Sequence, residues 1–257
     1  MKMKKIMLLV MSILLLTGCK SDDNKLILAT EAGFAPYEYY QDGEIVGVDI
    51  DIAREIAASL GKELVIKDVS FDFIINEIKS GKSDIGAAGM SITKERLEEV
   101  DFSVEYAVSN QVVIVPMDSK ITSIDQISNQ RIAVQLGTVA DSYVNENYKD
   151  ATVIRQKKYL SMVEDLKAGK VDLIIMDLLP ASEIVKSNDG LKILDEYLFT
   201  DKYGMAIKKG NKELLDKVND VLTRLMSEGK IEERIKKHIK RIRSEEHTSE
   251  LQSRPHI

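Results

Sequence analysis

The chain of 257 residues contains no tryptophan, three histidines and four prolines, and aromatic residues make up only 5% of it. Because Cys19 is its only cysteine, no disulfide can form within the chain. The sequence also lacks a nucleophile elbow, a Walker loop and any spaced cluster of metal ligands. These absences disfavour an enzyme, and we expect neither a metal nor another cofactor.

Positive charge is in short supply, with 36 lysines and arginines against 42 aspartates and glutamates and a net charge of −6. This acidic balance argues against a nucleic-acid partner, which would need a basic surface. Hydrophobic residues make up 44% of the chain, which is ordinary for a globular protein. The length is enough for two modest lobes or one larger domain.

Long apolar runs are also scarce. Residues 6–16 form one of eleven residues, too short to cross a bilayer, which takes about 20 helical residues. Lysines precede this run at positions 2, 4 and 5, as in a targeting segment. Residues 16–19, with the sequence Leu-Thr-Gly-Cys, resemble the lipobox of bacterial lipoproteins.

The lipobox resemblance implies that residues 1–18 are a lipoprotein signal peptide and that acyl chains attach to Cys19. Residues 19–25 would then be the lipidated cysteine and a polar tether, and two or more acyl chains would hold the protein on the membrane. Cleavage removes three lysines and no acid, which leaves 33 basic against 42 acidic residues and a net charge of about −9. The alternative is an ordinary secretory signal with an accidental cysteine.

Two stretches, residues 74–89 and 162–177, share one pattern when they are aligned on Gly81 and Gly169. Each reads as a helix that ends at a glycine in the left-handed cap position, followed by a buried strand. The pattern predicts two α/β lobes of similar plan. In this register Gly89 corresponds to Asp177, at the carboxyl end of a strand, where open α/β sheets bind their ligands.

Residues 84–102 add the groups that could bind a carboxylate. Small residues around Gly89 let another group approach the backbone closely. Thr93 can cap the helix that begins at residue 94, and Arg96 lies one turn further on, so its guanidinium can return toward the loop. If the lobes face each other, this arginine opposes Asp177, an arrangement that suits a zwitterion.

The rest of the chain alternates between the two element types, which predicts an α/β fold. We expect strands at residues 26–30, 64–69, 111–116, 131–135, 152–155, 172–176 and 203–207, and helices at 47–60, 71–79, 123–127, 159–167 and 211–227, with a short basic helix to about residue 240. Residues 244–257 lack periodicity and look like translated sequencing-adapter read-through, so we expect a non-native tail outside the fold. A genuine disordered tail is the alternative.

Residues 25–240 resemble the family 3 solute-binding proteins of bacterial amino-acid ABC transporters. Residues 47–52, Gly-Val-Asp-Ile-Asp-Ile, look like the family signature, with Val48 a small departure, and residues 88–96 with 101–103 resemble its amino-acid-binding segment. The resemblance implies a type II, two-lobed periplasmic-binding-protein-like α/β fold with two crossing hinge strands. Lobe 1 would be residues 25–111 plus 203–240 and lobe 2 residues 112–202, with hinges at 112–116 and 202–204.

Carried over residue by residue, the resemblance implies that Arg96 pairs with the α-carboxylate of a free amino acid and that Thr138 completes this contact from lobe 2. Gly89, Ser91 and Asp177 would hold the α-ammonium group. For Asp177 the alternative is an ordinary helix cap. The protein would be a monomer, anchored by lipid on the extracellular face of the cell membrane, that delivers its ligand to the permease subunits of an ABC transporter.

The same resemblance implies that Phe34 and Phe71 enclose the ligand side chain, whereas the alternative for both is core packing. Glu31 and Gln135 would lie at its far end. A carboxylate there favours a basic or polar amino acid, unless Glu31 points to solvent. The rival functions are a dehydratase-like enzyme acting on small carboxylates on the same scaffold, and a sensor or adhesin that borrows the fold.

Overall fold

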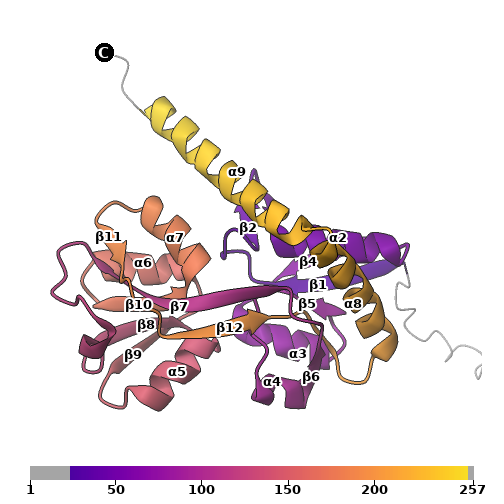
Figure 1. Cartoon of the computed structure of the whole chain (residues 1–257), viewed down its shortest axis with the longest axis horizontal. Helices are drawn as coiled ribbons and strands as arrows, with labels where there is room; N and C mark the ends of the chain where they lie inside the picture. The colour runs from indigo at the N-terminus through magenta and orange to yellow at the C-terminus, as the bar shows by residue number, and fades with distance from the viewer. Residues whose placement is uncertain (1–23, 254–257) are drawn as a thin grey trace, which may run out of the picture.

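The computed structural model describes the backbone of residues 24–253 and the side chains of residues 24–244, arranged as two α/β lobes (Figure 1). The predicted signal peptide and Cys19 lie outside the described residues. Within residues 24–253, no helix is both long enough and apolar enough to cross a membrane.

The first lobe, on the right in Figure 1, contains a five-stranded sheet in the order β4-β1-β5-β13-β6. Strand β1 runs parallel to β4 and β5, while β13 is antiparallel to β5 and β6. The elements of this lobe are β1 (Lys25–Thr30), β2 (Tyr39–Gln41), β3 (Glu44–Val46), α2 (Val48–Ser59), β4 (Glu63–Asp68), η1 (Phe71–Phe73), α3 (Ile74–Lys79), β5 (Ile85–Gly86), α4 (Lys94–Glu99), β6 (Val100–Phe102), β13 (Ala206–Lys208) and α8 (Lys212–Ser227).

The second lobe repeats this plan with the order β11-β7-β10-β8-β9, and β12 pairs with β7 beside it. Strand β8 runs parallel to β9 and β10, and β7 is antiparallel to β10, so β8 and β10 take the places of β1 and β5. Its elements are β7 (Ala107–Pro116), η2 (Ile124–Gln126), β8 (Arg131–Gln135), α5 (Val139–Asn147), β9 (Thr152–Gln156), α6 (Tyr159–Lys167), β10 (Leu173–Asp177), α7 (Leu178–Lys186), β11 (Leu191–Ile193) and β12 (Phe199–Tyr203).

The predicted repeat is present in both lobes. Helices α3 and α6 each lead through a glycine with positive φ, Gly81 at 69° and Gly169 at 67°, into strands β5 and β10. Only a residue without a side chain adopts this conformation at little cost, which is why glycine ends both helices.

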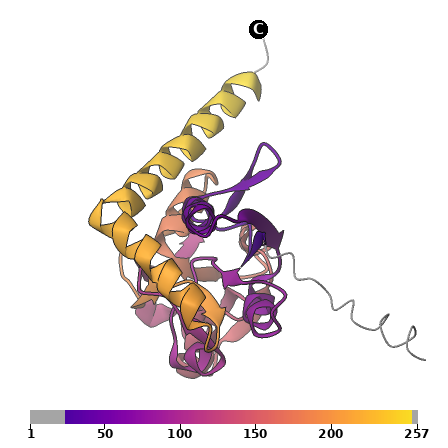
Figure 2. The same cartoon turned by 90° about the vertical axis from the view of Figure 1, so that its right-hand side faces the viewer.

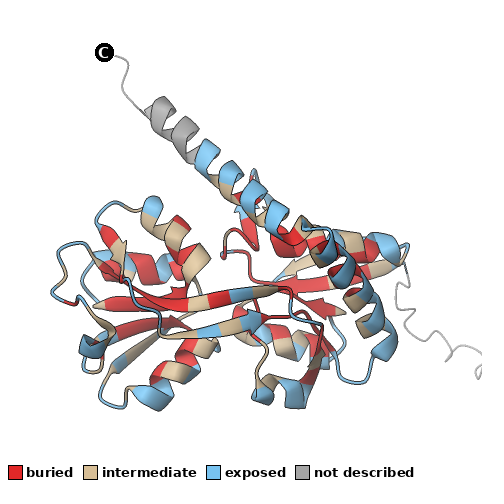
Figure 3. Cartoon of the chain, viewed as in Figure 1, coloured by how far each residue is buried: buried red, intermediate tan, exposed pale blue. Residues whose placement is uncertain are grey.

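Each sheet is buried on both faces (Figure 3). In β10, Ile174 and Met176 pack with α6 and α7, while Leu173 and Ile175 pack with α5 on the other side. Because successive side chains of a strand point to opposite faces, a strand covered on both sides is apolar throughout. This explains the continuous apolar runs that identified β7 and β10 in the sequence.

Two antiparallel strands connect the lobes. Residues 107–111 of β7 pair with residues 199–203 of β12, and the two strands run together between the lobes in Figure 1. The predicted hinge at residues 112–116 is wrong, because that half of β7 is held between β10 and β11 inside the second sheet. The predicted return strand at 203–207 is divided, since Gly204 and Met205 separate β12 from β13.

The last helix, α9 (Lys230–Ser253), continues past residue 240, where the sequence predicted its end. No glycine or proline interrupts residues 230–253, so nothing local stops the helix. Its first turns pack on α2 and α8, where the buried His238 contacts Asp51 (2.9 Å) and the Tyr39 hydroxyl (3.0 Å). Further along, the helix projects from the body of the protein (Figure 2). Whether residues 244–257 are foreign to the natural chain stays a prediction.

Gly47 precedes α2 with φ 139° and lies against the chain that leads into β2. A Cβ atom built on it would be 2.0 Å from the carbonyl oxygen of Tyr37, a distance that atoms cannot occupy. Gly61 also has a positive φ (65°), but a Cβ there meets nothing within 4 Å. A side chain at Gly47 would therefore cause both backbone strain and steric overlap, whereas a side chain at Gly61 would cause backbone strain alone.

We predict that Gly47→Ala lowers the free energy of unfolding by about 3 kcal/mol or more, because strain and overlap add. Gly61→Ala, the matched control, should cost only about 1–2 kcal/mol from its left-handed backbone. Urea unfolding of both variants measures the difference. Equal losses would contradict the steric account.

Candidate functional site

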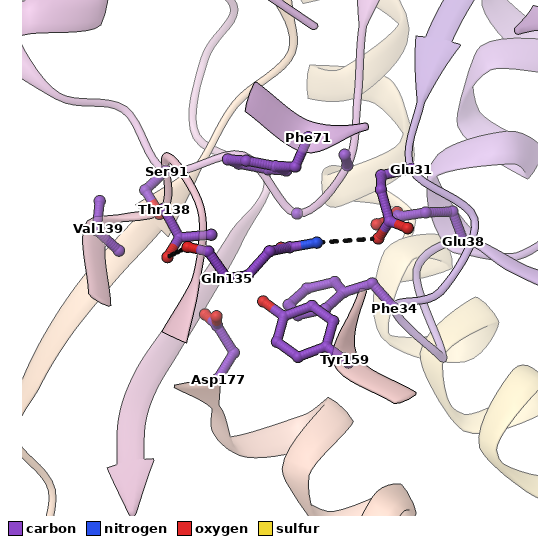
Figure 4. A pocket seen from close by; sticks show the side chains of 12 residues that line it. Glu31, Phe34, Glu38, Phe71, Ser91, Gln135, Thr138, Val139, Tyr159 and Asp177 are labelled. Carbon is purple, nitrogen blue, oxygen red and sulfur yellow. Dashed lines mark hydrogen bonds between the residues drawn. The ribbon is translucent and has the colours of Figure 1, made fainter. Parts of the chain in front are cut away.

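The carboxyl ends of four strands, β1 and β5 from the first lobe and β8 and β10 from the second, converge on one cavity between the lobes. The residues that line it are Glu31, Phe34, Glu38, Phe71, Ala88, Gly89, Ser91, Gln135, Thr138, Val139, Tyr159 and Asp177 (Figure 4). Eight of the nine residues that the sequence predicted for the ligand site are among them. The ninth, Arg96, lines an adjoining pocket that shares Thr138 and Val139.

Arg96 reaches from α4 to both lobes. Its guanidinium donates to the carbonyl oxygens of Ser91 (2.6 Å) in the first lobe and Gly137 (3.0 Å) in the second, and it lies 5.3 Å from the centre of the Phe71 ring. Burial lowers the pKa of Arg96 to about 10, against the attraction of Asp201 and Asp177, so the group keeps its charge at neutral pH. This fork of donors can bind a carboxylate in two-point fashion.

The second lobe offers a helix start beside that guanidinium. Thr138 caps α5: its hydroxyl accepts from the backbone N–H of Asp141 (3.3 Å) and donates to the carbonyl oxygen of Gln135 (2.8 Å). Gly137, with φ 80°, makes the turn that brings this cap to the cavity. The positive end of the helix adds to the local preference for an anion.

Two carboxylates, Asp201 and Asp177, lie near Ser91 and Tyr203. The Ser91 hydroxyl donates to Asp201, and the Tyr203 hydroxyl donates to Asp177. Burial first, and then the charge of Asp177, raises the pKa of Asp201 to about 7; burial also raises the pKa of Asp177. Two acids held this close are well placed to receive an ammonium group, whose charge would favour their ionised forms.

Aromatic rings form two walls of the cavity. Phe71 lies on one side, and Phe34 and Tyr159 lie on the other with ring centres 5.3 Å apart (Figure 4). Phe34 and Phe71 are both buried, so they also serve the packing that the sequence analysis kept as the alternative. The cavity is therefore flat-sided, as suits a planar or extended side chain.

Glu31 closes the end of the cavity farthest from Asp177. It is 1% exposed, and it does not point to solvent. Lys158 from the second lobe binds its carboxylate, and the Gln135 amide donates to it at 3.3 Å. Burial raises the pKa of Glu31, and Lys158 and Gln135 oppose that rise.

The site includes residues that the sequence analysis did not identify, chiefly Glu38, Tyr159 and Asp201. Asp201 lies two residues before Tyr203 on β12, and the strand's alternation of inward and outward residues was the available signal. Glu38 and Tyr159 carried no local signal, because they reach the cavity only through the folding of the loop after β1 and the closure of the lobes. In the described part of the chain, no group of three or more His, Cys, Asp or Glu residues could hold a metal ion.

The lobes are closed tightly on the cavity. Its volume is about 10 Å³, room for about one water molecule. An amino acid can therefore enter only if the lobes part, and Arg96, Lys158 and Gln135 are among the side chains whose contacts cross between them.

Residues 26–241 match the family described as bacterial extracellular solute-binding proteins, family 3. The chain belongs to this family. The resemblance and the two-lobed fold expected from the sequence are thereby confirmed.

Named relatives of this family 3 protein share its sequence over most of its length. The arginine-binding extracellular protein ArtP of Bacillus subtilis is 31% identical over 86% of this chain and 88% of that protein. The substrate-binding protein AbpA of Streptococcus pneumoniae, solved with L-arginine, is 31% identical with a TM-score of 0.82, over 85% of this chain and 96% of that one. An ancestral arginine-binding protein, solved with arginine and with glutamine, is 35% identical with a TM-score of 0.79. The match covers 83% of this chain and 97% of that one.

The acid at position 201 generates a prediction for the ligand-free protein. Its pKa in the folded state, about 7, exceeds the ordinary 3.8, so the folded state binds more protons than the unfolded state between these values. The free energy of unfolding should therefore fall as pH rises from about 4 to about 7, by at most about 1.4 kcal/mol per pH unit from this group.

We predict that Asp201→Asn flattens this fall between pH 5 and pH 7, as measured by urea unfolding without amino acids. Asp189→Asn, at an exposed aspartate beyond α7, is the control and should leave the wild-type slope unchanged. Parallel curves for the wild type and Asp201→Asn would show that the carboxyl group at position 201 does not carry the effect.

Proposed function

We propose that this family 3 protein captures a basic amino acid, arginine first among candidates, between its lobes and delivers it to the permease of an ABC transporter. The observation that carries the proposal is the composition of the cavity. Arg96 and the start of α5 lie at one end, and buried carboxylates lie at both ends of the cavity. Burying a zwitterion without water is costly unless each charge is paired, and this site holds a partner for each.

In this proposal the ligand α-carboxylate binds Arg96 and the N–H groups near Thr138, in place of the carbonyl contacts that Arg96 makes now. Asp177, Ser91 and the Gly89 carbonyl hold the α-ammonium group. Phe34 and Phe71 enclose the side chain.

The residues at the far end of the cavity determine which ligand side chain the site prefers. Glu31 and Glu38 lie there with Gln135, and Lys158 is already paired with Glu31, so the carboxylates at this end outnumber the cations. A basic side chain therefore fits better than an acidic one. The relatives solved with or named for arginine support this choice, and the one also solved with glutamine keeps polar amino acids as the second candidate.

The location of this activity rests on the sequence. We propose that residues 1–18 are cleaved, that Cys19 carries the lipid anchor, and that residues 19–25 tether the two lobes to the outer face of the membrane. The lobe limits proposed are residues 25–111 with 203–240, and 112–202, with a hinge at 202–204 where β12 passes into β13. The protein is proposed to act as a monomer.

Binding is favoured over the dehydratase-like alternative because the matched family is one of binding proteins. Catalysis would need a positioned acid or base. In this proposal the buried acids of the cavity pair with the positive charges of the bound amino acid.

The first test is a thermal-shift screen of the purified protein against the twenty standard amino acids and cystine. We predict a large rise in melting temperature with arginine, because a ligand at a hundredfold excess over its dissociation constant adds about 2.7 kcal/mol of stability. We choose thermal unfolding as the readout because the chain has no tryptophan whose fluorescence a ligand could quench. A shift only with neutral polar amino acids would keep the transport function and remove the basic ligand; no shift with any would overturn the proposal.

We predict that Arg96→Ala weakens amino-acid binding by about thirtyfold or more, the cost of leaving a buried charge without its partner. Titration calorimetry measures it, with urea unfolding to establish that the variant is folded. Lys94→Ala, an exposed residue of the same helix, should bind as the wild type does. Near-wild-type affinity in the folded Arg96→Ala variant would exclude the role given to Arg96.

A further inference from the structure

The last helix, α9, has no part in the proposed ligand site. The sequence predicted a basic helix there, and residues 230–242 contain six lysines and arginines against two glutamates, both in the first turn. In residues 24–229 the balance is the reverse, with 24 basic against 35 acidic residues. Helix α9 is therefore a concentration of positive charge on an otherwise acidic protein.

The two sides of α9 have different surroundings. One side packs on α2 and α8, where Ile231 and His238 are buried. Away from that side, four basic residues are exposed, and we call them the basic face: Lys236, Lys237, Lys240 and Arg241. Because residues three and four apart are neighbours on a helix surface, these side chains form one continuous stripe of positive charge.

The lysines of the basic face differ from the other basic residues of the helix, which have acidic partners. Those pairs are Lys230 with Glu228, Arg234 with Glu55, and Arg243 with Glu183. Lys236, Lys237 and Lys240, in contrast, form no ion pair with any residue that the structure describes. Their three ammonium groups lie within little more than one turn of helix, where like charges repel each other unless an anion is near.

The proposed location of the protein supplies an extended anion. The tether of residues 19–25 would hold the first lobe beside a bilayer, and α9 packs on α2 and α8 of that same lobe. A bilayer that contains anionic lipids has a negative surface potential, which attracts lysines and arginines that come within about 10 Å of it. An exposed stripe of lysines on a helix that projects from the body matches such a surface in charge and in shape (Figure 2).

We propose that the basic face of α9 binds the headgroups of anionic lipids and so orients the first lobe on the membrane. This role lies beyond ligand capture and rests on the proposed lipid anchor only for the presence of a bilayer. The protein itself covers the apolar side of the helix, so the contact is electrostatic, without insertion into the acyl chains. The anchor makes even weak binding effective, because a second contact of an attached molecule is intramolecular.

Attachment through α9 would leave the second lobe able to move. The tether and α9 both join the first lobe, whereas the second lobe is connected to it through β7 and β12. Arg243, which contacts Glu183 of the second lobe, lies outside the basic face. Closure would then move the second lobe against a first lobe that the membrane holds in place.

The first test measures vesicle binding by residues 20–257, which keep every residue of the described fold and carry no lipid. We predict that this protein co-sediments with phosphatidylcholine vesicles that contain about one third phosphatidylglycerol, and that about 0.5 M salt releases it. Vesicles of phosphatidylcholine alone should not bind it. Equal binding to both compositions, or binding that salt leaves unchanged, would overturn the inference. No binding to the anionic vesicles would also overturn it and leave the basic face to an acidic protein partner.

The second test removes the lysines of the basic face. We predict that the triple variant Lys236→Gln, Lys237→Gln and Lys240→Gln binds the anionic vesicles about tenfold more weakly or worse, because each lysine near such a surface adds to the attraction. Urea unfolding establishes that the variant is folded. Should it fail to fold, the lipid and salt dependence of the wild type still decides the question.

The matched control removes the same number of charges elsewhere. It replaces three exposed lysines by glutamine, namely Lys120, Lys149 and Lys212. Because its net charge equals that of the first variant, it should bind the anionic vesicles within about threefold of the wild type only if the position of the charges matters. Equal losses in the two variants would assign the effect to net charge and overturn the inference.

Amino-acid binding separates this inference from the proposed function. None of the six substituted lysines lines the cavity, so both variants should keep the wild-type thermal shift with its amino acid. A protein that binds its amino acid but no anionic vesicle keeps the proposed ligand capture and loses the role of α9. A protein that binds anionic vesicles through the basic face but no amino acid keeps the role of α9 and loses the proposed ligand capture.

Discussion

The buried carboxylate of Asp49 is the interaction on which the site depends. One of its oxygens accepts from the Gly89 N–H and the other from the Tyr106 hydroxyl, so the start of α2, the turn after β5 and the segment that leads into β7 meet at one side chain. Burial raises the pKa of Asp49 to about 6, against these two donors. Gly89 can lie this close to Phe34 only because it lacks a Cβ, which would be 2.4 Å from the ring. Asp49, which belongs to the family signature at residues 47–52, thus holds the site in shape although it does not line the cavity.

The two lobes share one topology but present different chemistry at matching places. In each, an inner parallel strand and its neighbour end at the cavity, with Glu31 and Gly89 in the first lobe and Gln135 and Asp177 in the second. The common plan guarantees that the strand ends face each other, since both sheets direct their carboxyl ends to the same space. The equivalent position is Gly89 in the first lobe and Asp177 in the second, so one side of that space has a neutral turn and the other has a carboxylate.

Local signals explain what the sequence could predict. The bounds of β8 and α6 coincide with the predicted ones because apolar periodicity and the cap at Gly169 define them within a few residues. Most of the eight cavity residues came instead from the family resemblance, whereas Gly89 and Asp177 were also indicated by the repeat, as matching positions at the carboxyl ends of strands. Glu38 and Asp201 escaped because their environment is made by distant segments. The end of α9 was misplaced because composition suggested a foreign tail, whereas residues 230–253 contain no glycine or proline that would end the helix locally.

The site is short of positive charge, and closure makes that shortage costly. As the lobes approach, Glu31, Glu38, Asp177 and Asp201 lose water together, and Arg96 and Lys158 cannot pair with all of them. Burial raises the pKa of every one of these acids, so each binds a proton more readily in the closed, ligand-free protein than it would in water. A cationic ligand would take the place of those protons and pair with charges that the closed fold has already desolvated. Affinity and the pH dependence of stability therefore have one origin: the same carboxylates that weaken the empty closed form at neutral pH are the ones that a basic amino acid would stabilise.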